Sequence, residues 1–467
     1  MLFSSLEFLI LFLPAALGGY YLLPKKCGCR NYWLFAASVL FYAWGEPTFV
    51  LVMLGSIAFN YLVALGIDGF RSRQKVAHLF LWGGISGNIC ILGAWKYANF
   101  ITGVLRDWMP WCHGVIPQTS ILLPIGISFF TFQATSYIID VYRGIVNVQR
   151  NPFCLGLYIA LFPQLVAGPI VRYSTVCEQI EGRKESWSGF VDGTYRFLVG
   201  FNKKMLLANL LSVASDTSFV FKSECCAMAW LGAVSYTLQI YFDFSGYSDM
   251  AIGLGKMFGF QFQENFNYPY VSKSISEFWR RWHISLGSWF RDYVYFPLGG
   301  SRVGRLRLVF NLAIVWLLTG IWHGASWNFI LWGVAYGILI MFEKLVGIQR
   351  WIDASKSFSA MWRLFTMSAV VLGWVLFRSP DLSSAVCHVK AMFGMTCGGL
   401  YDASALYELG ELKVIMPVAI IVALPLGGRM ACAVGAKCAM LGQMLLFLVS
   451  FSFLVINAHN PFIYFNF

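Results

Sequence analysis

The feature that most constrains this chain is a series of apolar runs, each close to the length that crosses a membrane. Short loops separate the runs, and the Lys and Arg residues are scattered through them. Of the 467 residues, 58% are hydrophobic and only 12% are charged, which is not the composition of a water-soluble globule. A spanning helix needs about 20 predominantly apolar residues, so the runs predict roughly 10–11 transmembrane helices plus re-entrant or interfacial helices. The chain is therefore predicted to be all-α and polytopic, with one integral-membrane domain over residues 1–467.

The net charge of +12 could suggest a nucleic-acid partner. Its distribution argues against one, because the basic residues do not form a patch but lie in loops between apolar runs. Such loops meet anionic lipid headgroups and set membrane topology. We expect membrane lipids and no nucleic acid as partners of these cations.

The twelve cysteines are spread over the chain, and several of them, such as Cys90 and Cys154, lie within apolar runs. In that setting a cysteine acts as a small buried hydrophobe. The neighbouring pairs Cys27–Cys29 and Cys225–Cys226 lack the further Cys or His partners that a zinc site would need. No metal site is predicted.

A single histidine, His323, lies within Trp316–Gly333, eighteen residues that carry no other ionisable side chain. An imidazole at membrane depth is costly unless it has a partner or borders a water-filled cavity, so it is a candidate functional group. The alternative is that His323 only packs, donating a hydrogen bond to a backbone carbonyl. The segment alone does not choose between the two.

A second stretch, Ser274–Gly300, mixes charged and aromatic residues in a way that is unusual for a lipid-facing span. Trp and Tyr favour the membrane interface and Arg favours phosphates, so this stretch is either a helix dipping into a cavity or an interfacial anchor. Helical spacing would place Trp279, His283 and Phe290 on one face.

Four further ionisable residues are predicted to form pairs. Glu277 and Arg281 stand at helical i, i+4 spacing. Asp243 and Asp249 lie in an apolar setting, where they either pair with the Arg residues of the 274–300 stretch or bond to local backbone and hydroxyl groups.

Proline, glycine and charge predict where the runs turn or break. The run from Leu308 to Ile340 is predicted to span, turn near 323–326 and return. Pro163 and Pro169, with Gly168, predict a kinked or broken helix in the run from Cys154 to Tyr173, which is tolerated where it faces protein or a cavity.

Other stretches are predicted from their polarity. The stretch from Leu122 to Gly144 is apolar but carries Asp140 among other polar groups, so it should line the interior. Ser174–Ser188 is predicted to be a solvated loop. His388 and the charges of Glu408–Lys413 are likewise assigned to loops, with no chemistry.

At these two central stretches the chain resembles a known family. The segments SEFWRRWHISLGSWFRDYVYFPLGG and TGIWHG resemble the membrane-bound O-acyltransferase family, and most closely its bacterial alginate O-acetyltransferase branch. The resemblance continues through nearly the whole chain, at 123–144, 161–173, 241–260 and the closing PFIYFNF of 461–467. It implies a central catalytic cavity in which His323 is catalytic and His283 is the second signature histidine.

Acyl transfer to a hydroxyl needs a base, because the hydroxyl must lose its proton as it attacks. His323 is the candidate base, and His283 would act as a second acid or base or would position the donor. Asn328 or the backbone N–H groups of Gly324–Ser326 could stabilise the oxyanion.

The resemblance also implies the substrates and the setting. An acetyl group would come from a cytoplasmic thioester, either acetyl-CoA or a carrier-bound acyl group, with no permanently bound cofactor. It would cross a bacterial inner membrane to extracytoplasmic acetyltransferase partners that modify an exopolysaccharide such as alginate. Arg280 and Arg281 would hold the phosphates of the donor, or else lipid headgroups.

Two other functions remain open at this stage. One is D-alanyl transfer to teichoic acid, whose transferase looks similar in the same segments. The other belongs to a different class, a transporter exporting a sugar or lipid, and the absence of paired Gly- or Pro-interrupted segments in matching halves argues against it.

The end of the chain, His459–Phe467, is aromatic up to its last residue. Its simplest interpretation is an anchor docked into the protein or the membrane interface. The other interpretation rests on the likeness of PFIYFNF to the closing motif of a small D-alanylation partner. Tyr464 would then be activated by His323 and relay the acyl group as an ester.

The basic clusters Lys25–Arg30, Arg71–Lys75 and Arg302–Arg307 are predicted to face the cytoplasm, because compact basic clusters beside apolar runs are retained there. Single cysteines introduced into these loops, in a background without reactive native cysteines, should be shielded from an impermeant thiol reagent in intact cells. Labelling from outside at any of the three loops would contradict the topology there.

Overall fold

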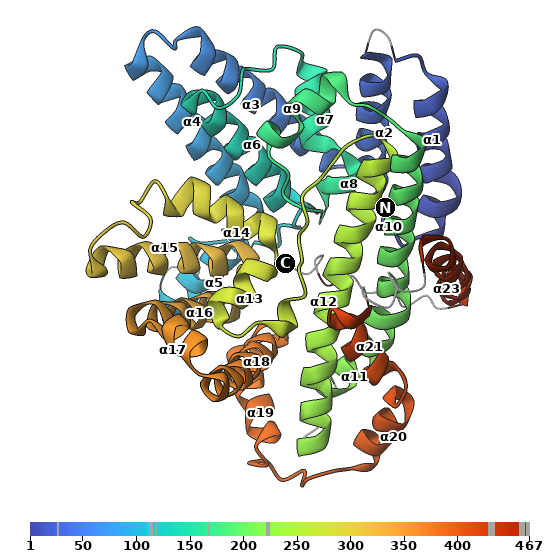
Figure 1. The fold of residues 1–467 in the computed structure, drawn as a ribbon. Coiled ribbons are helices and arrows are strands. Elements are labelled where there is room, and N and C mark those ends of the chain that lie inside the picture. The colour runs from blue at the N-terminus through green and yellow to red at the C-terminus, as the bar shows by residue number, and fades with distance from the viewer. Residues whose placement is uncertain are drawn as a thin grey trace. The chain divides into compact units, whose positions relative to one another are not determined.

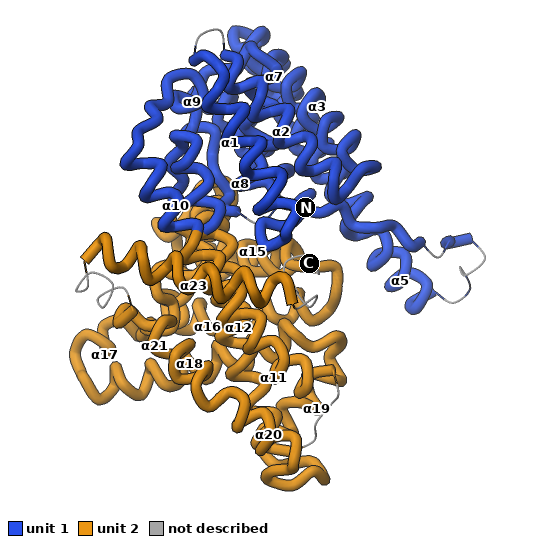
Figure 2. Tube along the Cα trace, turned by 90° about the vertical axis from the view of Figure 1, so that its right-hand side faces the viewer, with its two compact units in different colours: residues 1–197, 250–263 blue, residues 198–249, 264–467 orange. Residues whose placement is uncertain are grey.

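The computed structural model describes residues 1–25, 28–109, 111, 115–117, 119–166, 168–220, 225–427, 435–456 and 463. Within these ranges the regular structure is helical and no β-strand occurs (Figure 1). The chain divides into two compact units, residues 1–197 with 250–263 and residues 198–249 with 264–467 (Figure 2). Of the three divisions of the chain, two fall inside helices, α10 (Trp187–Asn202) and α12 (Cys226–Met257), and the third falls between residues 263 and 264. The prediction of a single domain over residues 1–467 concerns a functional unit as well as packing. The division into two compact units does not test it, so it stays a prediction.

Seven helical stretches among the described residues are long and apolar enough to cross a membrane, which confirms the polytopic all-α prediction. The sequence predicts 10–11 transmembrane helices, and some of its apolar runs form shorter helices, such as α2 and α6 with 17 residues each. The seven stretches are Val50–Gly69, Gln74–Trp108, Trp187–Val220, Arg305–His323, Trp327–Val346, Lys356–Arg378 and Ala436–Ile456.

The first unit is a set of packed helices in which α6 is central. As predicted, α6 turns polar side chains inward, since Gln133 and Asp140 are both buried. Its elements are η1 (Phe8–Phe12), α1 (Leu13–Leu22), α2 (Cys29–Gly45), α3 (Val50–Gly69), α4 (Gln74–Leu92), η3 (Gly93–Tyr97), α5 (Ala98–Trp108), α6 (Ile127–Arg143), α7 (Pro152–Ala160), α8 (Phe162–Leu165) and α9 (Tyr173–Gly182).

Two sequence predictions about this unit have different outcomes. The predicted break is confirmed, because α7 ends at Ala160, the backbone of Leu161 leaves the helical region (ψ 112°) and α8 is only four residues long. The predicted solvated loop over 174–188 is wrong in its first half. Residues 173–182 form α9, which buries Tyr173, Val176 and Ile180, and this packing outweighs its polar composition.

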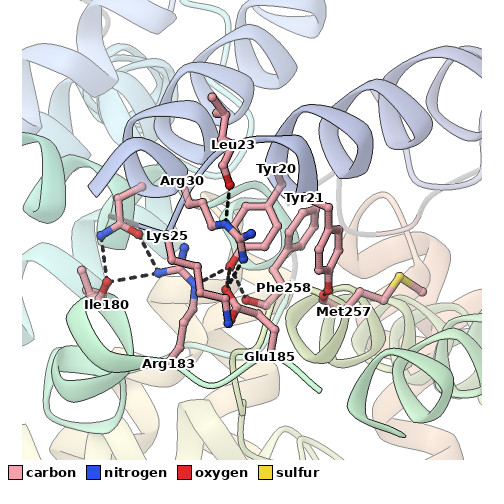
Figure 3. Close-up of polar contacts among 11 residues, drawn as sticks. Tyr20, Tyr21, Leu23, Lys25, Arg30, Ile180, Arg183, Glu185, Met257 and Phe258 are labelled. Atoms are coloured by element: carbon pink, nitrogen blue, oxygen red, sulfur yellow. Dashed lines mark hydrogen bonds and ion pairs between the residues drawn. The ribbon is translucent and has the colours of Figure 1, made fainter. Parts of the chain in front are cut away.

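One carboxylate, Glu185, holds several elements of the first unit together (Figure 3). Its oxygens lie 2.6 Å from the Lys25 ammonium and 2.9 Å from the Arg30 guanidinium, and they accept a hydrogen bond from the Tyr20 hydroxyl at 2.7 Å. Arg183 in turn donates to the Tyr20 hydroxyl at 2.8 Å. The end of α1, the start of α2 and the segment after α9 are therefore joined at one buried charge.

The second unit contains the two stretches that the sequence analysis singled out. Its largest fully buried side chains include Trp282, Trp332 and Trp374. Its elements are η5 (Lys203–Ala208), α11 (Asn209–Val220), η6 (Pro269–Val271), α13 (Ile275–Arg281), α14 (Ile284–Phe290), η7 (Arg291–Tyr295), α15 (Arg305–His323), α16 (Trp327–Val346), α17 (Ile348–Ala354), α18 (Lys356–Arg378), α19 (Leu382–Met392), α20 (Ala403–Leu412), α21 (Ile415–Ala423) and α23 (Ala436–Ile456).

The two aspartates of α12 have partners that the sequence did not predict. Asp243 lies 2.7 Å from the Lys204 ammonium and Asp249 lies 2.7 Å from that of Lys203, with both carboxylates buried. The expectation was an arginine from 274–300 or a local group. Both lysines belong to the π-helix η5, which packs beside this part of α12.

Two residues assigned to loops are helical and buried. His388 lies in α19, and Glu408 lies in α20, where its carboxylate accepts a hydrogen bond from Thr217. Both residues are polar, and packing of these helices in the second unit buries them.

Replacing Glu185 with Gln should destabilise the protein. Burial raises the pKa of this carboxyl, but hydrogen bonds from Lys25, Tyr20 and Arg30 outweigh it and lower the pKa from 4.5 to about 2. The charged form therefore stabilises the fold by roughly 2–3 kcal/mol above pH 4.5, and this contribution is lost as pH falls toward 2.

Thermal unfolding of the purified protein tests this expectation. The Tm of Glu185→Gln should lie below that of the wild type at pH 7, and the gap should narrow at pH 3. Glu178, exposed on α9, provides the matched control Glu178→Gln, which should unfold like the wild type. Equal Tm values for Glu185→Gln and the wild type at pH 7 would contradict this role of Glu185.

Candidate active site

The hairpin of α15 and α16 places His323 at its turn, as the sequence predicted. Two glycines let the helices touch backbone to backbone. A methyl group at Gly320 would lie 2.5 Å from the Phe329 carbonyl oxygen, and one at Gly333 would lie 2.5 Å from that of Trp316. A side chain at either position would force the helices apart, so this contact fixes where α15 ends.

His323 is buried and oriented by its own helix. Its Nδ1 lies 2.7 Å from the Thr319 carbonyl oxygen. A carbonyl only accepts, so Nδ1 carries the proton and Nε2 of the neutral ring is an acceptor. The ring packs against Trp332 and Phe377, with centroids 4.8 Å and 5.5 Å away. His323 thus makes the carbonyl contact of a packing histidine and keeps the nitrogen that a general base requires.

His283 does not continue a helix. It has a left-handed backbone (φ 45°) and separates α13 from α14. The prediction that Trp279, His283 and Phe290 share a helical face is therefore wrong, since no single helix contains all three. A left-handed conformation is costly for a residue other than glycine and occurs where surrounding contacts impose it, often at functional sites.

Those contacts come from Asn265. Its Oδ1 lies 3.2 Å from Nδ1 of His283 and also accepts hydrogen bonds from the backbone N–H and the hydroxyl of Ser285. Its Nδ2 donates to the Ser248 hydroxyl at 3.1 Å. Asn265 Oδ1 is thus an acceptor, so Nδ1 of His283 carries the proton and Nε2 does not. Burial lowers the pKa of His283 well below its usual value, and a positive charge on His323 would lower it further.

Both histidines line one cavity of about 360 Å³. Its wall follows α15 from Leu312 to His323 and reaches Lys344 near the end of α16. Lys344 comes 17 residues after Trp327, the first residue of α16, a distance of roughly 25 Å along the helix axis. The cavity is therefore a channel along the hairpin, with His323 toward the turn and Lys344 toward the other end.

Aromatic rings form much of the cavity wall. Trp279 packs edge-on against Trp316, Trp332 and Tyr336, with centroids 5.0–5.2 Å away. Its indole N–H is buried and has no hydrogen-bond partner among the described residues, and the same holds for the Ser276 hydroxyl. An unpaired buried donor costs about 1–3 kcal/mol, which a polar ligand or water in the cavity would recover.

Three cations line the cavity, Arg280, Arg291 and Lys344. Arg291 is paired with Asp292 at 2.9 Å. Lys344 lies over the Tyr295 ring at 5.4 Å. Arg280 and Lys344 both line the cavity. Among the described residues, neither of them forms an ion pair.

The two predicted phosphate-binding arginines are separated by the structure. Arg280 lines the cavity, whereas Arg281 makes the predicted ion pair with Glu277 at 2.9 Å and donates to the Asn267 carbonyl. Arg281 is not among the residues of the cavity wall.

The other predicted residues lie elsewhere. The Asn328 amide donates to the Ser379 carbonyl at 2.7 Å, so this donor is used at the end of α18 and does not line the cavity. Tyr464 lies outside the described residues. Its neighbour Ile463 is buried, and the Ile463 N–H donates to Asp243 at 2.8 Å.

Sequence reasoning missed three residues that build this site, Asn265, Glu343 and Lys344. Glu343 accepts hydrogen bonds from the Ile275 and Ser276 N–H groups, each at 2.8 Å, and from the Trp362 indole. Glu343 and Lys344 could have been found from the sequence, because two adjacent charged residues in an apolar span indicate a functional role. No local signal pointed to Asn265. Among the described residues, His, Cys, Asp and Glu do not form a group of three that could hold a metal ion.

A multi-pass helical protein in which two histidines and two cations line one cavity has the groups that a membrane enzyme for group transfer needs. One end of the channel suits an anionic donor, and the other holds a base.

Comparison with known proteins specifies this class. The family model of membrane-bound O-acyltransferases matches residues 151–377. A probable alginate O-acetylase of Pseudomonas syringae is 45% identical over 395 residues, 84% of this chain and 75% of that protein. A peptidoglycan O-acetyltransferase of Helicobacter pylori is 34% identical over 85% of this chain and 80% of its own length. A teichoic acid D-alanyltransferase of Bacillus subtilis is 29% identical over 56% of this chain and 70% of its own. The chain belongs to the membrane-bound O-acyltransferase family, and it is an acyltransferase.

Removing the base should stop acyl transfer. Because a positioned histidine contributes about 10² to 10⁴ in rate, His323→Ala should lower kcat at least a hundredfold at normal membrane level. His283→Ala should impair transfer strongly but leave residual activity. His78→Ala on α4 is the matched control and should retain activity, since His78 bonds only Trp82 and Tyr142 in the first unit. Normal transfer by His323→Ala would refute its role.

Proposed function

We propose that the protein is an O-acetyltransferase that takes an acetyl group from a cytoplasmic thioester and delivers it across the bacterial inner membrane for O-acetylation of an exopolysaccharide such as alginate. The observation that carries this proposal is the channel along the hairpin. Cations stand toward one of its ends and His323 stands toward the other. The names of the relatives at 43–45% identity, all probable alginate O-acetylases, support acetyl as the acyl group.

The chemistry needs one proton acceptor at the reacting hydroxyl. The hydroxyl oxygen forms a bond to the thioester carbonyl carbon, and its proton passes to Nε2 of His323. The C–S bond then breaks, and the departing sulfur takes the proton from Nε2 of His323. His283, neutral and held by Asn265, orients the donor or exchanges protons near it. The unpaired Trp279 N–H is a candidate donor to the oxyanion, in place of Asn328.

The cations favour a donor with phosphate groups. Arg280 and Lys344 line the same cavity, where their like charges repel each other until an anion enters. Acetyl-CoA and a phosphopantetheine carrier both provide that anion beside a thioester. Arg280 remains a proposed phosphate ligand, and Lys344 replaces Arg281 as its partner.

The direction of transfer follows from the ends of α15. This helix begins at Arg305, in the cluster predicted to face the cytoplasm, and ends at His323 after 19 residues, roughly 28 Å away. A donor entering near Lys344 would react closer to the opposite membrane face. Extracytoplasmic acetyltransferase partners would receive the group there, with or without Tyr464 as a relay.

Two of the earlier alternatives fare differently. D-alanyl transfer is less favoured, because the D-alanyltransferase relative is 29% identical, compared with 45% for the O-acetylase relative. A transporter without covalent chemistry does not fit the family.

Donor binding should depend on Arg280 and Lys344 but not on Arg281. Arg280→Gln and Lys344→Gln should each raise the KM for acetyl-CoA roughly tenfold to a hundredfold with little change in kcat, as expected for loss of a charge-assisted contact.

The assay is transfer of radiolabel from acetyl-CoA to an acceptor by the purified protein. Arg281→Gln is the matched control and should keep its KM near that of the wild type. No labelled product from the wild type would overturn the proposed donor, and an equal effect of all three variants would overturn the assigned phosphate site.

A further inference from the structure

A second cavity in the same unit is not used by the proposed reaction. It encloses about 230 Å³ where residues from the end of α11, the segment after α18 and helix α19 meet. This volume holds roughly seven water molecules, or one sugar ring. Its wall is rich in polar side chains that carry a hydroxyl, a thiol or an imidazole, among them Ser218, Ser379, Ser383, Ser384, Cys387 and His388.

Three hydroxyl groups of this pocket already donate their protons to protein acceptors. Ser218 donates to the Met228 carbonyl at 3.1 Å, Ser379 to the Val375 carbonyl at 2.8 Å and Ser384 to the Asp381 carboxylate at 3.1 Å. A hydroxyl has one proton and two lone pairs, so each of these oxygens remains an acceptor. Three serines therefore present acceptors, not donors, to whatever enters.

His388 adds another acceptor. Its ring stacks on Phe219 with centroids 4.1 Å apart and an interplanar angle of 6°, and its Nε2 lies 3.1 Å from the Ala229 carbonyl oxygen. Since a carbonyl only accepts, Nε2 carries the proton and Nδ1 keeps its lone pair. Burial lowers the pKa of His388, although the bond to Ala229 opposes this, so the ring stays neutral. Nδ1 has no partner among the described residues.

The charge of the pocket wall further restricts the class of ligand that can bind. The described residues of the pocket wall are all uncharged. Arg378, a cation over the Phe219 ring at 5.8 Å, is paired with Asp216 at 2.7 Å and does not line the pocket. Among the described residues, the wall offers no cation to an anionic ligand and no carboxylate to an ammonium ion. A neutral ligand rich in hydroxyl groups matches both constraints.

We propose that this pocket is a binding site for a neutral, hydroxyl-rich ligand of the size of one sugar ring. Ligand hydroxyls donate to the serine oxygens and to the His388 imidazole. The apolar edges of the pocket, at Phe219 and Ala391, cover the C–H face of such a ring.

The pocket adjoins the catalytic hairpin through the end of α18. The Ser379 carbonyl accepts from Asn328 of α16, and Phe377, two residues earlier, packs on His323. A bound sugar would therefore lie beside the helix end that supports the catalytic ring. Binding itself does not rest on the proposed reaction, because none of the residues that make the pocket takes part in it.

Saturation-transfer NMR on the full chain in nanodiscs, prepared without sugar-based detergent, tests the site. The probes are methyl α-mannopyranoside and its uronate, which differ by one carboxylate. The neutral sugar should receive saturation and the uronate should bind about tenfold more weakly. His323→Ala should bind the neutral sugar like the wild type, which separates this site from the catalytic one.

Ser383→Phe should fill the pocket and abolish the signal, and it is expected to fold because Ser383 is exposed. Val386→Phe is the matched control, since Val386 is also exposed on α19 but does not line the pocket. Its signal should equal that of the wild type, with similar Tm values for all variants. Undetectable binding of the neutral sugar, preference for the uronate or an unchanged signal in Ser383→Phe would each overturn the proposal.

Discussion

Close packing of α15 against α16 is the constraint on which the catalytic unit depends. At Gly320 and Gly333 the backbones are in contact, and no side chain fits between them. That contact brings the two ends of the hairpin into register, so that His323 lies at the turn and Glu343 and Lys344 lie toward the other end. The cavity that contains His323 and Lys344 lies beside this hairpin, and residues from α13 to η7 form the rest of its wall.

Glu343 extends this order to the next element. Its carboxylate accepts the first N–H groups of α13, which have no partner within the helix, and so ties α13 to α16. Arg280 and His283 follow along the chain and are carried with it. A buried carboxylate is expensive without such bonds, and three donors to one acid make it a structural anchor. The sequence shows Glu343 only as a charged residue in an apolar span and does not reveal these partners.

How much could be predicted depended on how local each signal was. The span, turn and return around His323, the break before α8 and the Glu277–Arg281 pair follow from spacing within one segment, and all three are confirmed. His283 was found from its motif, but its left-handed backbone depends on Asn265, which lies eighteen residues earlier and gave no local signal. Asn328 was a reasonable oxyanion donor by position. Only the packing of α18 shows that its amide is used elsewhere. The helix α9 was missed because tertiary burial orders a sequence whose own preference is weak.

His323 is also the last residue of a 19-residue helix, and this position has an electrostatic consequence. The peptide dipoles of α15 add up to a partial negative charge at its C-terminal end, where a cation is stabilised by about 0.3–1 kcal/mol, and up to about 2 kcal/mol when partly buried. A histidine that acts as a general base is neutral before the reaction and becomes an imidazolium when it takes the proton of the attacking hydroxyl. The helix end therefore favours the charged form of the His323 ring, so in the proposed reaction the segment that spans the membrane would also lower the barrier to proton transfer.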